Sequence, residues 1–481
     1  MNFLASLIAL LSSSVTYAPP PIKAMGSLWP KPQEQIGFEH NNVQDGVVII
    51  GGGIIGLSTA YSLALALNET VRTSKAQHRR RIPKITIVES SDRLCPAASS
   101  QATGGLGDFG FGENKTGVAG VSSLSYKMHV EMAAKYNGEE VYGFGEQLVY
   151  RLQPKNFTGT PSPADDWGSD NPPIPVPLSD LPSWVRTSDD WEARRLSSGP
   201  KVAHLDPKQF CPFLAERVKD LGVHFEMSAN VTSVDFDTTR QSFASVEIRR
   251  ASGSTHVLPC KAIVLAAGPW SDRIFSQLFP DAKVKLPMNS TGAAGNHIRI
   301  KIPGWKSNSK ETSVQVYYTN VTPDGSRFDV TSFTNGDLYI GGWGAIPEEI
   351  PRLATFVHAQ PSEVKAMLPW VKRYVAVDSD KELEYFDVGR CYRPTIIGPK
   401  RPIITKLDWE LLSKDSTSCP SPSSSNEGDS LIAGGLIINT GHSSDGITLG
   451  LGSGKIASEL VLGQTPSIDI SSLGLPESAR L

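Results

Sequence analysis

Four runs of apolar residues predict buried strands of a parallel sheet. They are Val47–Ile50, Ile85–Val88 and residues 263–266 and 436–439. Continuous apolar strands of this kind are buried on both faces, and we expect helices to cover both faces of the sheet. Helical patterns follow the first run, over residues 57–67, and the last run, up to Leu462. The pattern therefore predicts a layered α/β fold.

Other segments alternate apolar and polar residues. Residues 313–319 (SVQVYYT) and 337–342 (DLYIGG) are typical of a half-exposed antiparallel sheet. We place this sheet in a substrate or cap domain formed by residues 126–199 and 286–384. Residues 46–125, 200–285 and 385–465 then form a discontinuous nucleotide-binding domain.

Shorter elements complete the prediction. Helices are expected at residues 124–136 and 204–218, and strands at residues 223–227 and 231–236. Residues 154–200 are rich in proline and tryptophan, which indicates an irregular cap over the substrate side or, alternatively, a surface loop. The Ser-rich residues 413–430 are expected to be flexible.

Composition narrows the class of protein. The chain has 481 residues and a formal net charge of −3, long enough for two domains and too balanced to suggest a nucleic-acid binder. No cysteine or histidine cluster has metal-ligand spacing, so no metal is expected. A small-molecule enzyme is the default interpretation.

The N-terminus resembles a targeting segment. Residues 3–11 are apolar but too short for a stable membrane span, and residues 1–18 fit a cleavable secretory signal peptide that lacks an early Lys or Arg. Sequons fit a secreted glycoprotein and stand at Asn68, Asn114, Asn156, Asn230, Asn289 and Asn320. The five cysteines show no disulfide framework, and a start at Met25 would give a cytoplasmic protein instead.

The first strand leads into a glycine motif. Gly51, Gly53 and Gly56 occupy the GxGxxG positions, which allow a tight turn, close approach of a pyrophosphate and close packing of helix on strand. Glu89 ends the second strand, where such motifs place an acid for the ribose hydroxyls. Glu89 lies further along than the usual ~20 residues, because residues 68–84 are interpreted as a basic surface insertion.

Two further segments suit a long cofactor. Residues 90–112 are rich in small side chains, which lets the backbone lie against a planar group or simply makes a flexible loop. Near the C-terminus, a strand, a glycine turn at residues 441–446 and a helix repeat the opening pattern. A second helix N-terminus would hold the far end of an extended ligand.

Together, VVIIGGGIIG with Glu89, ASSQATGG, VLAAGPWSD and GHSSDGITLGLGSGK resemble the D-amino-acid oxidase superfamily of FAD-dependent oxidoreductases, in its glycine oxidase and sarcosine oxidase branch. GNHIRI, TPDG and DLYIGG look more like poorly characterised fungal members. The resemblance covers residues 47–463 in pieces. It implies a Rossmann-like FAD-binding domain, discontinuous in sequence, with an α+β substrate domain built on an antiparallel sheet.

The resemblance also assigns cofactor-binding residues by position. The ADP part of FAD would be held by Gly51, Gly53, Ile54, Ile55, Gly56 and Glu89, with Val231 at the adenine and Ala267 and Gly268 near the diphosphate. The flavin would be held by Ser99, Ser100, Gly441, Ser444, Asp445, Gly446, Ile447 and Thr448.

Five side chains are candidates for chemistry or for lining the substrate site. By resemblance, Arg393 binds the substrate carboxylate, with a structural salt bridge as the alternative, and Cys391 bonds the flavin covalently, with a plain buried cysteine as the alternative. His442 would polarise substrate or reduced flavin, or serve only as a turn residue. Tyr317 and Tyr339 would line the substrate sheet or pack within it.

The implied reaction is oxidation of a C–N bond in an amine or amino acid, with hydride passing to flavin N5 and O2 as acceptor, giving H2O2. An FAD dehydrogenase with another acceptor, an oxidase whose substrate lacks a carboxylate, and a non-catalytic flavin-binding scaffolding or trafficking protein are the alternatives. Substrate identity and oligomeric state stay open.

Overall fold

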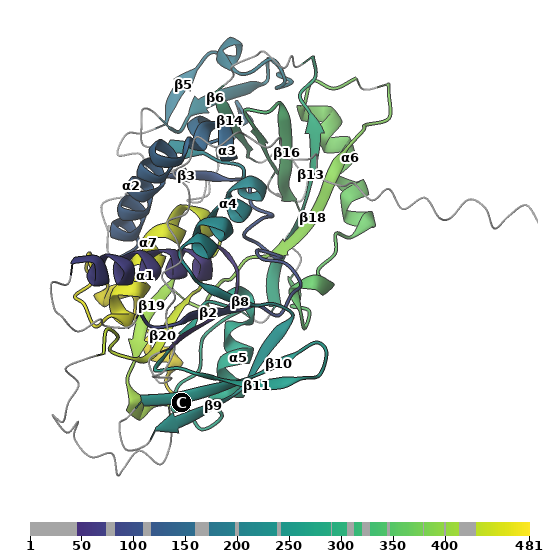
Figure 1. The fold of residues 1–481 in the computed structure, drawn as a ribbon. Helices are drawn as coiled ribbons and strands as arrows, with labels where there is room; N and C mark the ends of the chain where they lie inside the picture. Colours follow the sequence, from purple (N-terminus) through teal and green to yellow (C-terminus); the bar gives the residue numbers. More distant parts are fainter. Residues whose placement is uncertain are drawn as a thin grey trace, which may run out of the picture. The chain divides into compact units, whose positions relative to one another are not determined.

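The computed structural model describes residues 46–73, 82–108, 117–158, 173–197, 202–237, 242–289, 291–304, 312–319, 328–343, 347–378, 380–398, 401–412 and 430–481 (Figure 1). The predicted signal peptide, Met25, the basic run at residues 79–81 and nearly all of the Ser-rich loop lie outside these residues. The part from Asn42 to Leu481 forms one compact unit by its internal contacts, and its division into two domains stays a prediction.

A six-stranded sheet holds the predicted parallel strands. Its order is β19 (Ile403–Leu407), β20 (Gly435–Thr440), β12 (Ala262–Leu265), β1 (Val47–Ile50), β2 (Ile85–Val88) and β8 (His224–Glu226). All neighbours are parallel except β19 and β20. Every residue of β1, β2, β12 and β20 is buried, which confirms the interpretation of these apolar runs.

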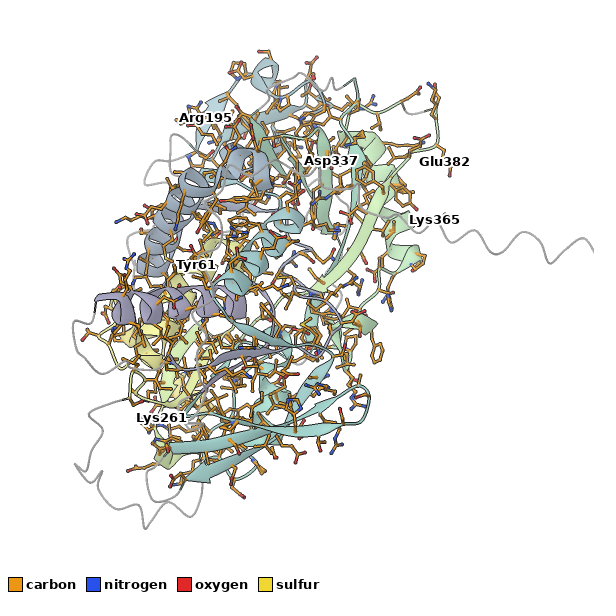
Figure 2. All side chains as sticks on the ribbon, viewed as in Figure 1. Tyr61, Arg195, Lys261, Asp337, Lys365 and Glu382 are labelled. Atoms are coloured by element: carbon orange, nitrogen blue, oxygen red, sulfur yellow. The ribbon has the colours of Figure 1, made fainter. Side chains whose placement is uncertain are left out.

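Helices cover one face of this sheet. Val47, Ile49 and Val264 point into a core shared with helices α1, α4 and α7. The α-helices within the described residues are α1 (Ile54–Thr73), α2 (Val118–Tyr136), α3 (Gly138–Tyr142), α4 (Pro207–Asp220), α5 (Ser271–Leu278), α6 (Pro361–Tyr374) and α7 (Gly446–Val461). Tyr61 of α1, labelled in Figure 2, lies in this layer.

The other face differs from the expectation of helices. Val48, Ile50 and Leu265 pack mainly on a three-stranded antiparallel sheet, together with α5. That sheet is formed by β9 (Ala229–Asp237), β10 (Ser242–Arg250) and β11 (Thr255–Pro259). A buried strand needs apolar cover of any kind, and Phe243 and Ile248 of β10 supply it here.

Three predicted helix boundaries need correction. Helix α1 continues to Thr73, so residues 68–73 belong to the helix and not to a surface insertion. Helix α2 begins at Val118, before the predicted residue 124. Helix α4 begins at Pro207 because His204 pairs in a strand and Asp206 is the N-cap, accepting a hydrogen bond from the Lys208 N–H at 3.0 Å.

Among the described helices, α1 alone is long and apolar enough to cross a bilayer by length and composition. The core helix of a soluble protein passes the same test, and α1 packs within the core on α4, α7 and the six-stranded sheet.

An eleven-stranded sheet holds the predicted alternating strands. Its main order is β17 (Pro347–Glu349), β13 (Thr291–Lys301), β16 (Asp337–Trp343), β15 (Phe328–Ser332), β14 (Ser313–Tyr318), β4 (Gly145–Pro154), β6 (Trp191–Arg195) and β5 (Ile174–Val176). Strand β18 (Phe386–Tyr392) pairs with β13, and β7 (Val202–His204) pairs with β3 (Gly105–Gly107) and β4. All pairs are antiparallel except β14 with β4.

The prediction that this sheet is half exposed is wrong. Val316, Val330 and Ile340 face α6 in an apolar core, as the alternation requires. The opposite, polar face is buried too: Gln315 is 2% exposed and Thr331 is 0% exposed. Alternation had correctly separated the two faces, but the polar face meets other protein groups and a cavity rather than solvent.

Candidate active site

One cavity of about 600 Å³ is lined by both large sheets. Gly51 of the opening glycine turn and Gly446 at the start of α7 both line it, although they are far apart in sequence. Tyr339 of β16 and Arg393, just after β18, line it from the eleven-stranded sheet. The two predicted glycine turns therefore share one continuous space.

The opening turn has the geometry that the motif requires. Gly51 has φ +111°, and a Cβ there would lie 2.5 Å from the Ala266 carbonyl oxygen of the neighbouring strand. A Cβ on Gly56 would lie 2.0 Å from the Gly51 carbonyl oxygen, so Gly56 lets the helix close on the turn and does not itself line the cavity. Gly53, Ile54 and Ile55 do line it.

The small-residue loop folds back onto the N-terminus of α1. The Ile54 N–H donates to Ser99 Oγ at 3.0 Å, and Ser99 lines the cavity. Ser100 does not line it, because its hydroxyl donates to the Cys95 carbonyl oxygen at 2.7 Å. The loop thus lies at the cavity wall, while the two serines have different positions.

Glu89 stands where the second strand ends and is 6% exposed. Its Oε2 accepts the Gly52 N–H and its Oε1 accepts the Ser91 N–H, each at 2.8 Å. The carboxylate lines the cavity beside the glycine turn, and Val231, Ala267 and Gly268 line it as well. Glu89 therefore orders the turn and lies on the cavity wall.

The C-terminal turn brings His442, Ser444, Gly446 and Ile447 to the cavity. Three other predicted residues of this turn, Gly441, Asp445 and Thr448, do not line it. Thr448 instead donates its hydroxyl hydrogen to the Gly105 carbonyl oxygen at 3.4 Å.

His442 is held in the neutral form. It is 2% exposed, its Nε2 lies 2.9 Å from Ser453 Oγ, and burial lowers its pKa to about 3. At neutral pH it offers a ring nitrogen or N–H group and no charge.

Arg393 lines the cavity, and its guanidinium nitrogens lie 3.8 and 3.9 Å from the point where a Cβ of Gly295 would stand. In the described part of the chain, no carboxylate pairs with this guanidinium, whereas nearby Arg390 pairs with two. A structural salt bridge, the alternative role of Arg393, therefore lacks an acidic partner among the described residues. A guanidinium facing a cavity is suited to a carboxylate ligand.

The other predicted residues of the substrate end fall in different places. Cys391 and Tyr339 line the cavity, whereas Tyr317 does not and packs beside Val149. The Tyr339 hydroxyl donates to the Gln101 carbonyl oxygen at 2.9 Å, tying β16 to the small-residue loop. Burial raises the pKa of the Cys391 thiol.

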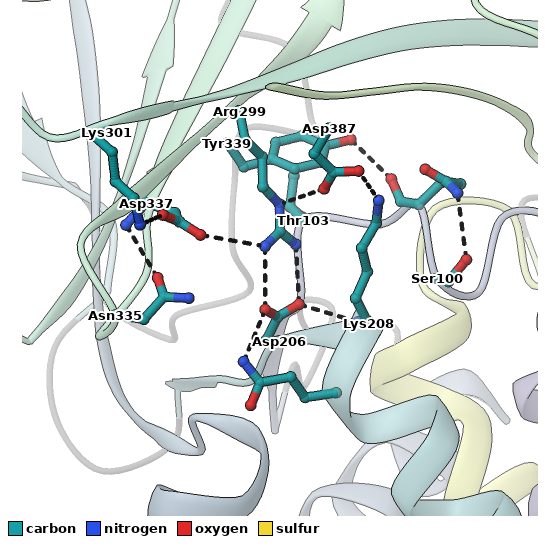
Figure 3. Close-up of polar contacts among 12 residues, drawn as sticks. Ser100, Thr103, Asp206, Lys208, Arg299, Lys301, Asn335, Asp337, Tyr339 and Asp387 are labelled. Carbon is teal, nitrogen blue, oxygen red and sulfur yellow. Dashed lines mark hydrogen bonds and ion pairs between the residues drawn. The ribbon is translucent and has the colours of Figure 1, made fainter. Parts of the chain in front are cut away.

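An ion cluster holds this end of the cavity in place (Figure 3). Arg299 of β13 donates to Asp206 at the start of α4 through two bonds of 2.9 and 3.1 Å and pairs with Asp387 of β18 at 3.1 Å. Lys208 of α4 also pairs with Asp387. The cluster fixes α4 against two strands of the eleven-stranded sheet.

Sequence reasoning missed residues on the polar face of that sheet and one in the small-residue loop. Asp329 lines the cavity from β15, and Gln101 lines it with a buried Oε1 that has no hydrogen-bond partner. His297 stacks on Tyr339, with ring centroids 4.6 Å apart. Strand register could have placed Asp329 and Tyr339 on one face, but only the fold shows that this face meets a cavity.

The residues present fit FAD. One cavity joins the N-termini of α1 and α7, whose N–H groups and positive helix dipoles suit a pyrophosphate and a polar ring edge. The buried Oε1 of Gln101 is an unpaired acceptor on the wall between them. Among the residues that the structure describes, no group of His, Cys, Asp and Glu side chains is arranged to hold a metal ion.

Comparison with known proteins agrees with this site. The family model for FAD dependent oxidoreductases (DAO) matches residues 46–460. A candidate oxidoreductase of Schizosaccharomyces pombe is 23% identical over 426 residues, 86% of this chain and 94% of that protein. Glycine oxidase from Geobacillus kaustophilus superposes with a TM-score of 0.64 at 16% identity, covering 90% of this chain and 99% of that one. L-proline dehydrogenase from P. horikoshii gives 0.62 at 15% identity, covering 90% and 96%. The chain thus belongs to the DAO family and is an FAD-dependent oxidoreductase.

Proposed function

We propose that this enzyme oxidises the C–N bond of an amine or amino acid, with O2 as the electron acceptor. The observation that carries the proposal is Arg393, a guanidinium on the cavity wall without an ion pair among the described residues. It can fork onto a carboxylate with two charge-assisted hydrogen bonds and so fix the carbon that is to be oxidised.

When bound, FAD supplies the oxidising power by accepting a hydride at N5. The glycine turn and Glu89 would hold its ADP part, Ser99 would lie on the flavin side, and the N-terminal N–H groups of α7 would face the edge of the flavin ring. Tyr339 lines the substrate end, and its hydroxyl is held by the Gln101 carbonyl oxygen.

The structural neighbours support this reaction class. They include proteins named iminodiacetate oxidase and L-amino acid deaminase, with TM-scores of 0.58 and 0.61. Their identity to this chain is at most 18%, so they show only the fold. The proposed reaction of this chain rests on the position of Arg393.

We further propose that FAD is bound without a covalent link to Cys391. A thiolate is the nucleophilic form of cysteine, and burial raises the pKa of this thiol, which favours the unreactive protonated form.

The purified yellow protein tests the reaction and the acceptor together. A panel of amines and amino acids is mixed with it under anaerobic conditions, and loss of flavin absorbance is followed before air is admitted. Bleaching by an amino acid and rapid return of colour with H2O2 release are expected. Slow return in air would favour a dehydrogenase with another acceptor, and a flavin that no amine bleaches would contradict the proposal.

A further inference from the structure

Asp329 is a carboxylate on the cavity wall to which the reaction described above assigns no role. Among the described residues that line the cavity, only Glu89 and Asp329 are acidic. Glu89 lies at the end of β2 and accepts two backbone N–H groups there. Asp329 lies on β15, at the end of the cavity formed by the eleven-stranded sheet. The substrate end thus has its own negative charge.

Strand register fixes the direction of Asp329. It stands directly opposite Gly341 of β16, and directly paired residues share a face of the sheet. Tyr339 is two residues before Gly341 and lies on the same face. Its ring covers the glycine, since a Cβ on Gly341 would be 2.7 Å from Tyr339 Cε1. Asp329 and Tyr339 are therefore neighbours on the wall.

Arg393 acts on the same neighbourhood with the opposite charge. The pKa of the Tyr339 hydroxyl is raised first by burial and also by the negative charge of Asp329, while the positive charge of Arg393 lowers it. Both charged groups therefore act electrostatically on one hydroxyl. They do not neutralise each other by contact, because the guanidinium of Arg393 has no ion pair within the described chain.

We propose that Asp329 is a substrate-positioning residue that accepts hydrogen bonds from the substrate's amino group while Arg393 holds its carboxylate. A cation and an anion on one wall fit a ligand that carries both charges, so the preferred ligands are zwitterionic α-amino acids rather than amines without a carboxylate. This inference rests on the proposed function, in which Arg393 binds a carboxylate.

Three isosteric compounds test the inference apart from turnover. 2-Methylalanine carries both charged groups, 2,2-dimethylpropanoate replaces its ammonium by a methyl group, and tert-butylamine replaces its carboxylate by a methyl group. None has a hydrogen on the central carbon, so none can be oxidised there. Calorimetric titration of the flavin-containing protein should show tighter binding of 2-methylalanine than of either single-charge analogue.

Variants then separate the two contacts. Asp329→Asn should weaken 2-methylalanine about 10- to 100-fold and leave 2,2-dimethylpropanoate unchanged, because only the first ligand loses a charged hydrogen bond. Arg393→Leu should weaken both carboxylates and leave tert-butylamine unchanged.

Thr331→Val is the matched control. Thr331 lies two residues further on the same strand and face, it is 0% exposed, and it does not line the cavity. The variant should bind all three compounds as the unaltered protein does.

The inference is overturned if Asp329→Asn leaves 2-methylalanine binding unchanged, or if it weakens 2,2-dimethylpropanoate equally. Failure of the proposed function looks different. In that case the binding pattern would stand, and no amino acid with a Cα–H would bleach the flavin.

Discussion

The buried ion pair of Arg299 with Asp206 joins the eleven-stranded sheet to α4, and its contribution to the free energy of unfolding can be measured. The Arg299 side chain is 5% exposed and that of Asp206 is 6% exposed, and two hydrogen bonds of 2.9 and 3.1 Å join them. Arg299→Met keeps an unbranched stem, which preserves packing on Phe333, and removes the charge. Asp206 then keeps only neutral donors, from the Lys208 N–H and the Gln209 side chain.

We expect the free energy of unfolding to fall by about 3–5 kcal/mol at neutral pH, the usual range for removing one partner of a buried pair. Much of this loss comes from the carboxylate left without its cation. Asp206→Asn combined with Arg299→Met removes that charge as well, and Asn is also a good N-cap. The double variant should therefore lose less than Arg299→Met alone.

The loss should depend on pH. Burial alone raises the pKa of Asp206, but the hydrogen bonds and charge of Arg299 bring it below its ordinary value. In the unaltered protein, this group stabilises the fold above that ordinary value, near pH ~4, and the stabilisation is lost as the pH falls through the folded pKa. Without Arg299, burial is opposed mainly by the Lys208 N–H hydrogen bond, so the pKa of Asp206 rises and Asp206 becomes protonated at higher pH. The deficit of the variant should shrink from about pH 7.5 to about pH 5.

Urea unfolding of the flavin-containing protein at several pH values measures the effect. Lys127→Met is the control, because Lys127 and Glu131 form an exposed pair with side chains 75% and 64% exposed. That variant should change stability by less than ~0.5 kcal/mol. The reasoning is refuted if Arg299→Met resembles this control, or if its deficit is the same at both pH values.

Three further predictions concern the packing of α7 on α1, the attachment of the cofactor and the substrate site. Gly454→Ala should lower the free energy of unfolding by about 1–3 kcal/mol, because its Cβ would lie 2.4 Å from the Ser58 backbone of α1. Gly145→Ala is the control, since its Cβ would meet nothing within 4 Å, and equal unfolding midpoints for the two variants would contradict the prediction. Acid precipitation should leave the yellow colour in the supernatant for the unaltered protein and for Cys391→Ser alike, and colour in the pellet of the unaltered protein alone would establish a covalent link. Arg393→Leu should raise the KM of a carboxylate substrate by orders of magnitude, given ~2–5 kcal/mol for losing a charged partner, and an unchanged KM would remove Arg393 from the site.

Local patterns located the two glycine turns that line the cavity, and the roles of their residues in holding FAD stay predictions. The strand before Gly51 and the turn around Gly446 were located because their apolar runs and glycines are contiguous in sequence. Glu89 was found despite its distance from the motif, since it directly ends β2. The start of α4 was predicted at His204 instead of Pro207, because the pairing of His204 in β7 depends on residues far away in the chain.

The substrate half was harder to predict because alternation tells which side chains share a face and not what that face meets. Asp329 and Gln315 occupy polar positions of alternating strands, and solvent was the simplest environment for them. In the structure Gln315 is 2% exposed, and its Oε1 has no hydrogen-bond partner. Leaving a buried acceptor unpaired costs ~1–3 kcal/mol. Gln315 does not line the cavity, so a bound ligand does not account for this cost, whereas Asp329 lines the cavity and its polar side chain is better explained by a polar ligand than by stability.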